Sequence, residues 1–156
     1  MTQLNPQQFE QSLLKSFYDG GIEAESQYTS RVICNSDEEK FGDALTKELR
    51  NCKHFDISVA FITEGGFQVL VETLMQLDRK EISGRVLTTD YLNFTNPKAL
   101  LRLQEFENIE VRLYETDLQS DNTGFHTKGY IFKDRQDDEL YRVVIGSSNL
   151  TGPALS

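Results

Sequence analysis

Apolar positions recur along this chain at two spacings, one typical of amphipathic helices and the other of β-strands. Helical spacing, in which apolar residues lie three or four positions apart, predicts helices over residues 5–17, 36–51, 65–84 and 96–108. Alternating or continuous apolar runs predict extended segments over residues 27–35, 54–63, 85–91, 109–115, 126–133 and 141–148. Through most of the chain, helices and strands therefore follow one another.

Polar residues at the expected helix starts support these boundaries. Asn5 and Asn96 each precede a proline, which combines a good capping side chain with a residue suited to the first helical position. Ser36 and Glu39 have the spacing of a capping box, in which each side chain bonds the other residue's backbone N–H. These signals place three helix starts.

The order of the elements predicts the fold class. Alternating strands and helices predict an α/β fold, in which helices flank both faces of a mixed, mostly parallel β-sheet. The run 54–63 ends in a nearly continuous apolar stretch, which predicts a strand buried on both faces. No helix is expected between the last two strands, so we expect them to form a hairpin around residues 134–140.

Length and composition add limits. The 156 residues fit one domain over residues 1–156. No apolar run is long enough for a membrane span and no secretory signal opens the chain, so we expect a cytoplasmic protein without a membrane partner. Cys34 and Cys52 are expected to be reduced thiols. Because the sequence stops where a helix is expected to begin, we expect it to be part of a longer polypeptide, cut at its C-terminal side.

The formal net charge is −9, which argues against a protein that coats nucleic acid through a broad basic surface. Net charge describes long-range attraction rather than local chemistry. A phosphodiester held in one small basic pocket therefore stays compatible with this composition.

His126 and Lys128 are the first candidates for such a pocket. Residues two apart in a strand point to the same side, so an imidazole and an ammonium are expected to project together. Two groups that can both carry positive charge repel each other unless an anion lies between them. A phosphate fits, with the lysine as a point charge and the histidine as nucleophile or proton donor.

A polar turn about twenty residues later supplies complementary groups. Ser147, Ser148 and Asn149 follow Gly146 directly after the last expected strand, and they offer hydroxyl and amide donors to phosphate oxygens. Taken alone, a strand histidine is more often structural than catalytic, and such a turn is usually only a turn. The two segments in this order on adjacent strands are much more specific.

His-x-Lys followed by Gly-Ser-x-Asn resembles the signature of the phospholipase D superfamily. The similarity extends over residues 58–67, 84–100, 125–133 and 145–155. These stretches look like the phospholipase D-like domain at the N-terminus of certain bacterial superfamily II helicases, which resemble restriction and defence proteins. The resemblance covers nearly the whole chain and implies a helicase motor domain in the same full-length protein.

The resemblance implies a role for each matching residue. His126 matches the nucleophile that attacks phosphorus, and Lys128 and Asn149 match the phosphate ligands. Ser147 matches the small polar residue of the turn, and Ser148 beside it is assigned to phosphate binding as well. The family motif also has an acidic residue seven positions after the histidine, where this chain has Lys133. Asp134 comes one step later, which in a strand reverses the side-chain face, so the carboxylate is missing or comes from elsewhere.

The implied activity is a metal-independent phosphodiesterase or nuclease without a cofactor, acting on nucleic acid, DNA in preference to RNA. Because this mechanism needs two histidines and the chain has one motif, we expect a twofold homodimer that joins two motifs in one pocket. An alternative is a module that binds the phosphate backbone without cutting it and positions a helicase motor. A lipid phosphodiesterase is a third interpretation, with no membrane-facing apolar helix to support it.

Other features are weaker signals. Asp90 and Tyr91 end an expected strand and could border the pocket, although an ordinary turn explains them equally well. The cysteines and histidines together lack the spacing of a closed zinc site, so no metal is expected. No G-x-S-x-G elbow and no P-loop motif occurs.

Overall fold

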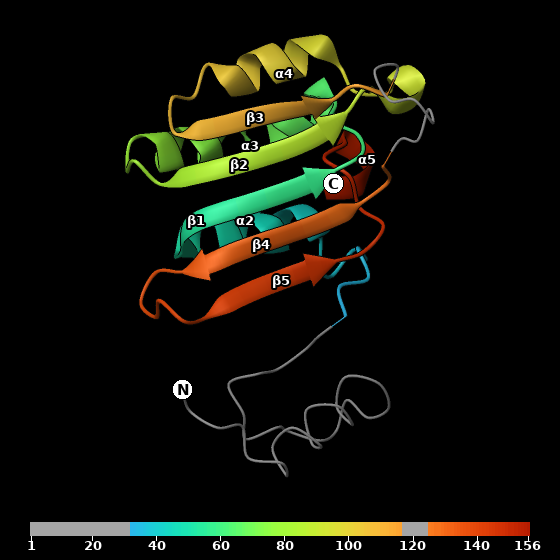
Figure 1. Cartoon of the computed structure of the whole chain (residues 1–156). Helices are drawn as coiled ribbons and strands as arrows, with labels where there is room; N and C mark the ends of the chain where they lie inside the picture. The colour runs from blue at the N-terminus through green and yellow to red at the C-terminus, as the bar shows by residue number, and fades with distance from the viewer. Residues whose placement is uncertain (1–31, 117–124) are drawn as a thin grey trace. The chain divides into compact units, whose positions relative to one another are not determined.

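The computed structural model describes residues 32–116 and 125–156 (Figure 1). Cys34–Ser156 form one compact unit. The other unit, Met1–Ile33, lies almost wholly outside the described residues, as do the helix expected over residues 5–17 and most of the extended segment expected over 27–35. The single-domain expectation for residues 1–156 stays a prediction.

A five-stranded sheet with strand order β3-β2-β1-β4-β5 forms the centre of this unit. Its strands are β1 (Cys52–Val59), β2 (Ser83–Thr89), β3 (Ile109–Tyr114), β4 (Lys128–Asp134) and β5 (Tyr141–Ile145). β2 runs parallel to both β1 and β3, whereas β4 is antiparallel to its neighbours β1 and β5. The mixed, mostly parallel sheet and the final hairpin are therefore confirmed.

The main helices are α2 (Phe41–Asn51), α3 (Glu64–Asp78) and α4 (Pro97–Gln104), followed at the end by the short α5 (Gly152–Leu155). A 3-10 turn, η1 (Tyr91–Asn93), follows β2. Figure 1 shows α2, α3 and α5 behind the sheet, and α4 packs against both α3 and β3. The α/β class is confirmed, and the described helices form one layer on one face of the sheet.

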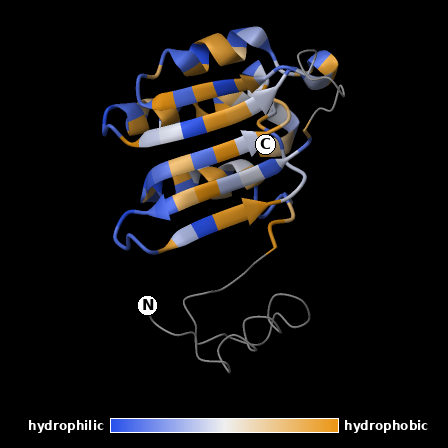
Figure 2. Cartoon of the chain, viewed as in Figure 1, coloured by the Kyte–Doolittle hydropathy of each residue, from blue (hydrophilic) through white to orange (hydrophobic). Residues whose placement is uncertain are grey.

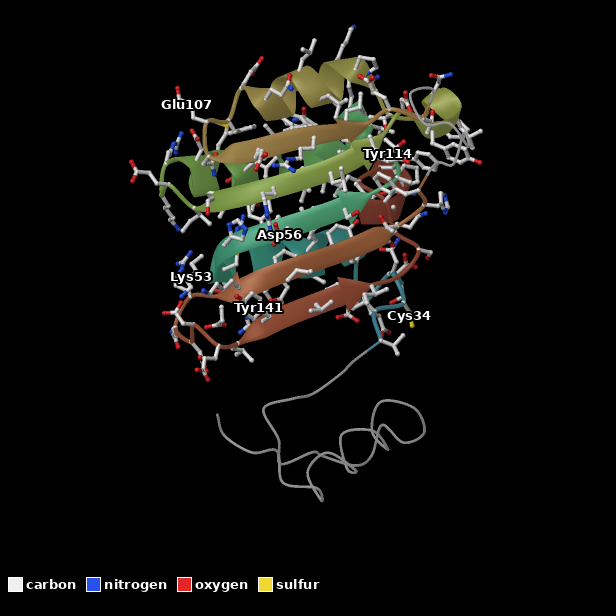
Figure 3. The ribbon with its side chains drawn as sticks, in the orientation of Figure 1. Cys34, Lys53, Asp56, Glu107, Tyr114 and Tyr141 are labelled. Atoms are coloured by element: carbon white, nitrogen blue, oxygen red, sulfur yellow. The ribbon has the colours of Figure 1, made fainter. Side chains whose placement is uncertain are left out.

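The burial pattern of β1 explains this one-sided arrangement. Phe55, Ile57 and Val59 point toward the helices and are buried, while His54 and Asp56 alternate with them and are half-exposed. The strand is therefore not buried on both faces, because every second side chain is polar. Figure 2 shows the alternation of hydropathy along the strands, and Figure 3 shows Asp56 on the face away from α2 and α3. Helix cover of both faces is thus not seen in residues 32–116 and 125–156.

Helix α2 begins five residues later than its sequence pattern predicts. Asn35 Oδ1 accepts a hydrogen bond from Phe41 N at 2.9 Å, and Ser36 Oγ accepts one from Glu39 N at 3.3 Å. Residues 37–39 therefore form bends rather than a helical turn. The buried stripe that begins at Phe41 is confirmed, and so is the cap of α4, where Asn96 Oδ1 accepts from two backbone N–H groups.

Candidate phosphate-binding active site

Strand direction gathers the predicted site residues at one edge of the sheet. β1, β2 and β5 all end at this edge and the antiparallel β4 begins there, as the arrowheads in Figure 1 show. The backbone N–H of Ala60, just after β1, donates to Thr127 O at 3.1 Å. Leu150 N, beyond β5, donates to Phe61 O at 3.1 Å. The topology thus brings residues 60–61, 126–128 and 149–150 side by side.

His126 and Lys128 are in direct contact. Lys128 Nζ lies 2.7 Å from His126 Nδ1 and 3.0 Å from the carbonyl oxygen of His126. The imidazole is exposed, whereas Lys128 is only 8% exposed, and this burial lowers the pKa of its ammonium group. An ammonium group has no lone pair, so in this contact Lys128 Nζ donates and His126 Nδ1 accepts.

The aromatic ring of Phe61 connects the predicted residues. Its centroid lies 5.4 Å from that of His126, in a T-shaped contact, and 5.9 Å from Lys128 Nζ. The backbone N–H of Phe61 donates to Asn149 Oδ1 at 3.1 Å. With Oδ1 occupied, the amide NH2 of Asn149 is the group left to donate to an anion. His126 and Lys128 therefore lie beside the ring of Phe61, and Asn149 is bonded to its backbone.

Phe61 was missed by the sequence analysis. Its position could have been inferred, because it lies near the end of the strand predicted over residues 54–63, and strand ends line the clefts of α/β sheets. Its identity as an aromatic contact of His126 could not, because the two residues are 65 positions apart. The sequence thus indicates that residue 61 lies near the site, but not that its side chain contacts His126.

Close packing fixes the segment that carries Asn149. Thr63 N donates to Leu150 O at 3.0 Å, which lays this segment along the start of α3. A Cβ atom added at Gly66 would lie 2.0 Å from Leu150 O, so only glycine permits this approach. The conformation of Asn149 therefore depends on a glycine in α3, far away in the sequence.

The turn around Asn149 has an open side. Ser147 is exposed and Ser148 is half-buried, and Tyr130 Oη donates to Ser148 O at 2.7 Å. Within the described residues, neither serine hydroxyl has a hydrogen-bond partner. A Cβ atom at Gly146 would meet no atom within 4 Å, so packing inside this unit does not require glycine there. Both hydroxyls are available to a ligand.

Asp90 and Tyr91 reach the same edge but have another role. Asp90 Oδ1 accepts hydrogen bonds from the backbone N–H of Thr116 at 2.9 Å and from its hydroxyl at 2.8 Å. These bonds, the backbone one first, hold the pKa of Asp90 below its usual value. Tyr91 is half-buried, and its backbone N–H donates to Thr89 Oγ1. In the described part of the chain neither residue contacts His126.

No carboxylate of residues 32–116 or 125–156 is hydrogen-bonded to His126. Lys133 lies on the open face of the sheet and pairs with Asp138 at 3.2 Å. Asp134 ends β4, at the edge opposite His126, where it accepts from the backbone N–H of Gln136 at 2.8 Å. The acidic residue next to the motif position therefore anchors the hairpin and does not orient the histidine.

The cysteines and histidines of the described residues do not form a metal cluster, and no group of three or more possible ligands occurs among them. His54 Nδ1 lies 2.7 Å from Ser83 Oγ, and its Nε2 lies 3.4 Å from Asp56 Oδ1, on the open face. Burial raises the pKa of the Cys52 thiol to about 11. No helix in the described part of the chain has the length and apolarity of a membrane span.

Comparison with known proteins agrees with this geometry. The family model described as "Cardiolipin synthase, PLD-like domain" matches residues 43–156, which include every strand of the sheet and all the predicted site residues. No curated protein matches the chain. Phospholipase D-like domains act in general on phosphodiesters, which fits a histidine, a lysine and an asparagine gathered at one sheet edge. The chain therefore belongs to the phospholipase D-like domain family.

Proposed function

We propose that this domain is a metal-independent phosphodiesterase that cleaves nucleic acid, DNA in preference to RNA. The supporting observation is Lys128, a buried ammonium in contact with His126 and without a carboxylate partner in the described residues. A buried charge without a counter-ion is costly. A substrate phosphate would supply the missing negative charge.

In this proposal, the phosphate first separates His126 from Lys128. A phosphate oxygen accepts the lysine's hydrogen bonds, which frees His126 Nδ1 and lets the ring change tautomer. A ring nitrogen then forms a bond to phosphorus while the bond from phosphorus to the leaving oxygen breaks. Lys128 and the amide of Asn149 stabilise the charge on the non-bridging oxygens, a task that metal ions perform in other phosphodiesterases.

The leaving oxygen needs a proton, and a second histidine would donate it. His126 of the partner subunit is the proposed donor, in a homodimer whose two motifs face one pocket. The same group then accepts a proton from water as the water attacks phosphorus and the N–P bond breaks, which restores both histidines. Sedimentation equilibrium tests this step, because a chain that stays monomeric at high concentration would contradict it.

A second function is supported by the surroundings of His126. With Nδ1 occupied by the lysine and no carboxylate near the ring in the described residues, His126 lacks the group that would orient it for attack. The domain would then bind the phosphate backbone without cleaving it and position a helicase motor in the same full-length protein.

Cleavage of labelled single- and double-stranded DNA in EDTA distinguishes the two functions. We expect wild-type protein to cut in EDTA, His126→Ala to lose at least about 10⁴-fold in rate, and His54→Ala to match wild type. His54 is a matched control because it is the other histidine of the chain and lies on the open face. Cutting by His126→Ala, or wild-type cutting that EDTA abolishes, would contradict the mechanism. Binding without cutting, retained in His126→Ala, would establish the binding module.

A further inference from the structure

The loop between β2 and α4 (residues 90–96) exposes an aromatic ring beside the proposed active site. Phe94 is 59% exposed, and so is its neighbour Leu92. Large apolar side chains are normally driven out of water. An exposed phenylalanine directly before the buried Thr95 is therefore a feature to explain.

Hydrogen bonds at both ends hold this loop in place. Thr95 is buried, and its hydroxyl donates to Thr89 O at 2.7 Å, which closes the loop on the end of β2. Asn96 N donates to Ile62 O at 2.8 Å, which ties the loop to the segment after β1. Phe94 is thus presented by a fixed scaffold.

The loop backbone is also strained. Leu92 and Asn93 have φ angles of 58° and 54°, in the left-handed region that residues other than glycine seldom adopt. Such conformations persist only where the surrounding structure imposes them, and they concentrate at sites that hold ligands. The same loop therefore combines a strained backbone with an exposed aromatic ring.

Two ring contacts connect Phe94 to the proposed nucleophile. The Phe94 centroid lies 5.1 Å from that of Phe61 in a T-shaped contact, and Phe61 lies 5.4 Å from His126. A T-shaped contact occupies at most one face of the Phe94 ring. Among the described residues, Phe94 stays 59% exposed at the same sheet edge as Lys128 and Asn149.

We infer that Phe94 is a stacking platform for one nucleobase of the strand whose phosphate lies at His126 and Lys128, so that the domain selects single-stranded nucleic acid. This inference rests on the proposed function. Bases in a duplex are already stacked on their neighbours, whereas an unpaired base can stack on an aromatic side chain. Stacking accepts every base, so the preference concerns strandedness rather than sequence.

A lipid surface is the other chemistry that exposed Leu92 and Phe94 could meet. The structure favours a base, because one ring on a loop bonded at both ends can stack on a planar group. Insertion into a bilayer would gain instead from a broad apolar face with basic flanks, whereas Asp90 lies in this loop and the whole chain carries a net charge of −9. Vesicle binding is therefore an outcome of the test.

The test compares three oligonucleotides with the full chain: a single strand with one 2-aminopurine, the same strand with abasic sites, and the corresponding duplex. Anisotropy reports affinity, and quenching of 2-aminopurine reports stacking. We expect Phe94→Ala to bind the intact strand about tenfold more weakly and to lose the quenching, while Phe94→Trp keeps both. Affinity for the abasic strand should not change in either variant.

Leu101→Ala is the matched control, because Leu101 is 62% exposed on α4 and is not part of the proposed site. It should behave as wild type, and thermal unfolding should show that all variants are folded. If wild type cleaves DNA but binds intact and abasic strands equally, the platform is wrong and the proposed function stands. If wild type binds neither strand, both are wrong. Loss of binding to phosphatidylglycerol vesicles in Phe94→Ala, with oligonucleotide affinity unchanged, would replace the base by a lipid.

Discussion

The two ends of β4 each bury a charged side chain on the helix-facing side, and these two side chains differ in their partners. Asp134 is 7% exposed and Lys128 is 8% exposed. Asp134 accepts hydrogen bonds from the backbone N–H groups of Gln136 and Asp137, and Arg142 Nη2 lies 2.6 Å from its Oδ2. Among the described residues, the Lys128 ammonium forms hydrogen bonds only with the ring and carbonyl of His126 and lies 5.9 Å from the centroid of the Phe61 ring.

The fold therefore compensates the charge of Asp134 but, within the described residues, not that of Lys128. The pKa of Asp134 is lowered by its hydrogen bonds to Gln136 and Asp137 and by Arg142, so its charged form is favoured in the folded protein. The pKa of Lys128 is lowered by desolvation, so its charged form is disfavoured. A cation that the fold does not compensate is suited to an anion that arrives with the substrate.

Of the changes at the two ends of β4, replacing Lys128 should have the largest effect on the cleavage rate. We expect Lys128→Met to reduce the rate of phosphodiester cleavage by about 10²–10³-fold, because one charge-stabilising donor is lost. The unfolding midpoint should stay the same or rise, because an apolar residue of similar length replaces an uncompensated buried charge. Rate assays and thermal unfolding measure the two effects separately.

Lys133→Met is the control for this variant. Lys133 lies on the same strand but on the open face, where it pairs with Asp138, so its loss should leave the rate unchanged. If Lys128→Met unfolded at a markedly lower temperature, the ammonium would be a structural element and the contrast between the two ends of β4 would fail.

Replacing Asp134 should give the opposite result. We expect Asp134→Asn to lower the unfolding midpoint by several degrees while the cleavage rate stays within about twofold of wild type, because mutations far from a site act independently of it. The amide still accepts from Gln136 N, but it no longer neutralises Arg142. A loss of activity in folded Asp134→Asn would place this carboxylate in the mechanism after all.

The pH dependence of this second effect has a defined sign. A carboxylate whose pKa is lowered on folding contributes stability above its usual pKa of 3.8, and loses it as the pH falls through the lower folded value. The difference in unfolding midpoint between wild type and Asp134→Asn should therefore be full at neutral pH and shrink in acid below about pH 4. Thermal unfolding across this range measures it.

The same contrast explains how far sequence reasoning could reach. Each of the described strands was predicted from its apolar pattern, and His126 with Lys128 from their spacing of two, because these signals depend on neighbours in the chain. That the described helices cover only one face of the sheet could not be predicted, because it depends on where the crossovers place the helices. Phe61 and Phe94 also escaped, since an aromatic residue after a strand is ordinarily assigned to the core.

For Asp134, the sequence predicted the direction of the side chain but not its hydrogen-bond partners. Its sequence position, one step from the expected acidic position, indicated that its side chain would face away from that position, and Lys133 indeed points to the open face. The hydrogen bonds that Asp134 makes to Gln136 and Asp137 depend on the conformation of the hairpin turn. Such hydrogen-bond partners depend on the backbone geometry of the turn, which cannot be read from the amino-acid sequence alone.

Binding of inorganic phosphate should give the smallest effect and the most direct comparison of the two ends. At ten times its dissociation constant, phosphate at Lys128 should stabilise the protein by about 1.4 kcal/mol, which raises the unfolding midpoint by about 4 °C. Chloride at equal ionic strength should not reproduce the shift. Lys128→Met should lose the shift and Lys133→Met should keep it, because Lys133 pairs with Asp138 whereas Lys128 has no carboxylate partner among the described residues. An equal shift in both variants would mean that phosphate binds away from His126, and the uncompensated charge on β4 would then need another explanation.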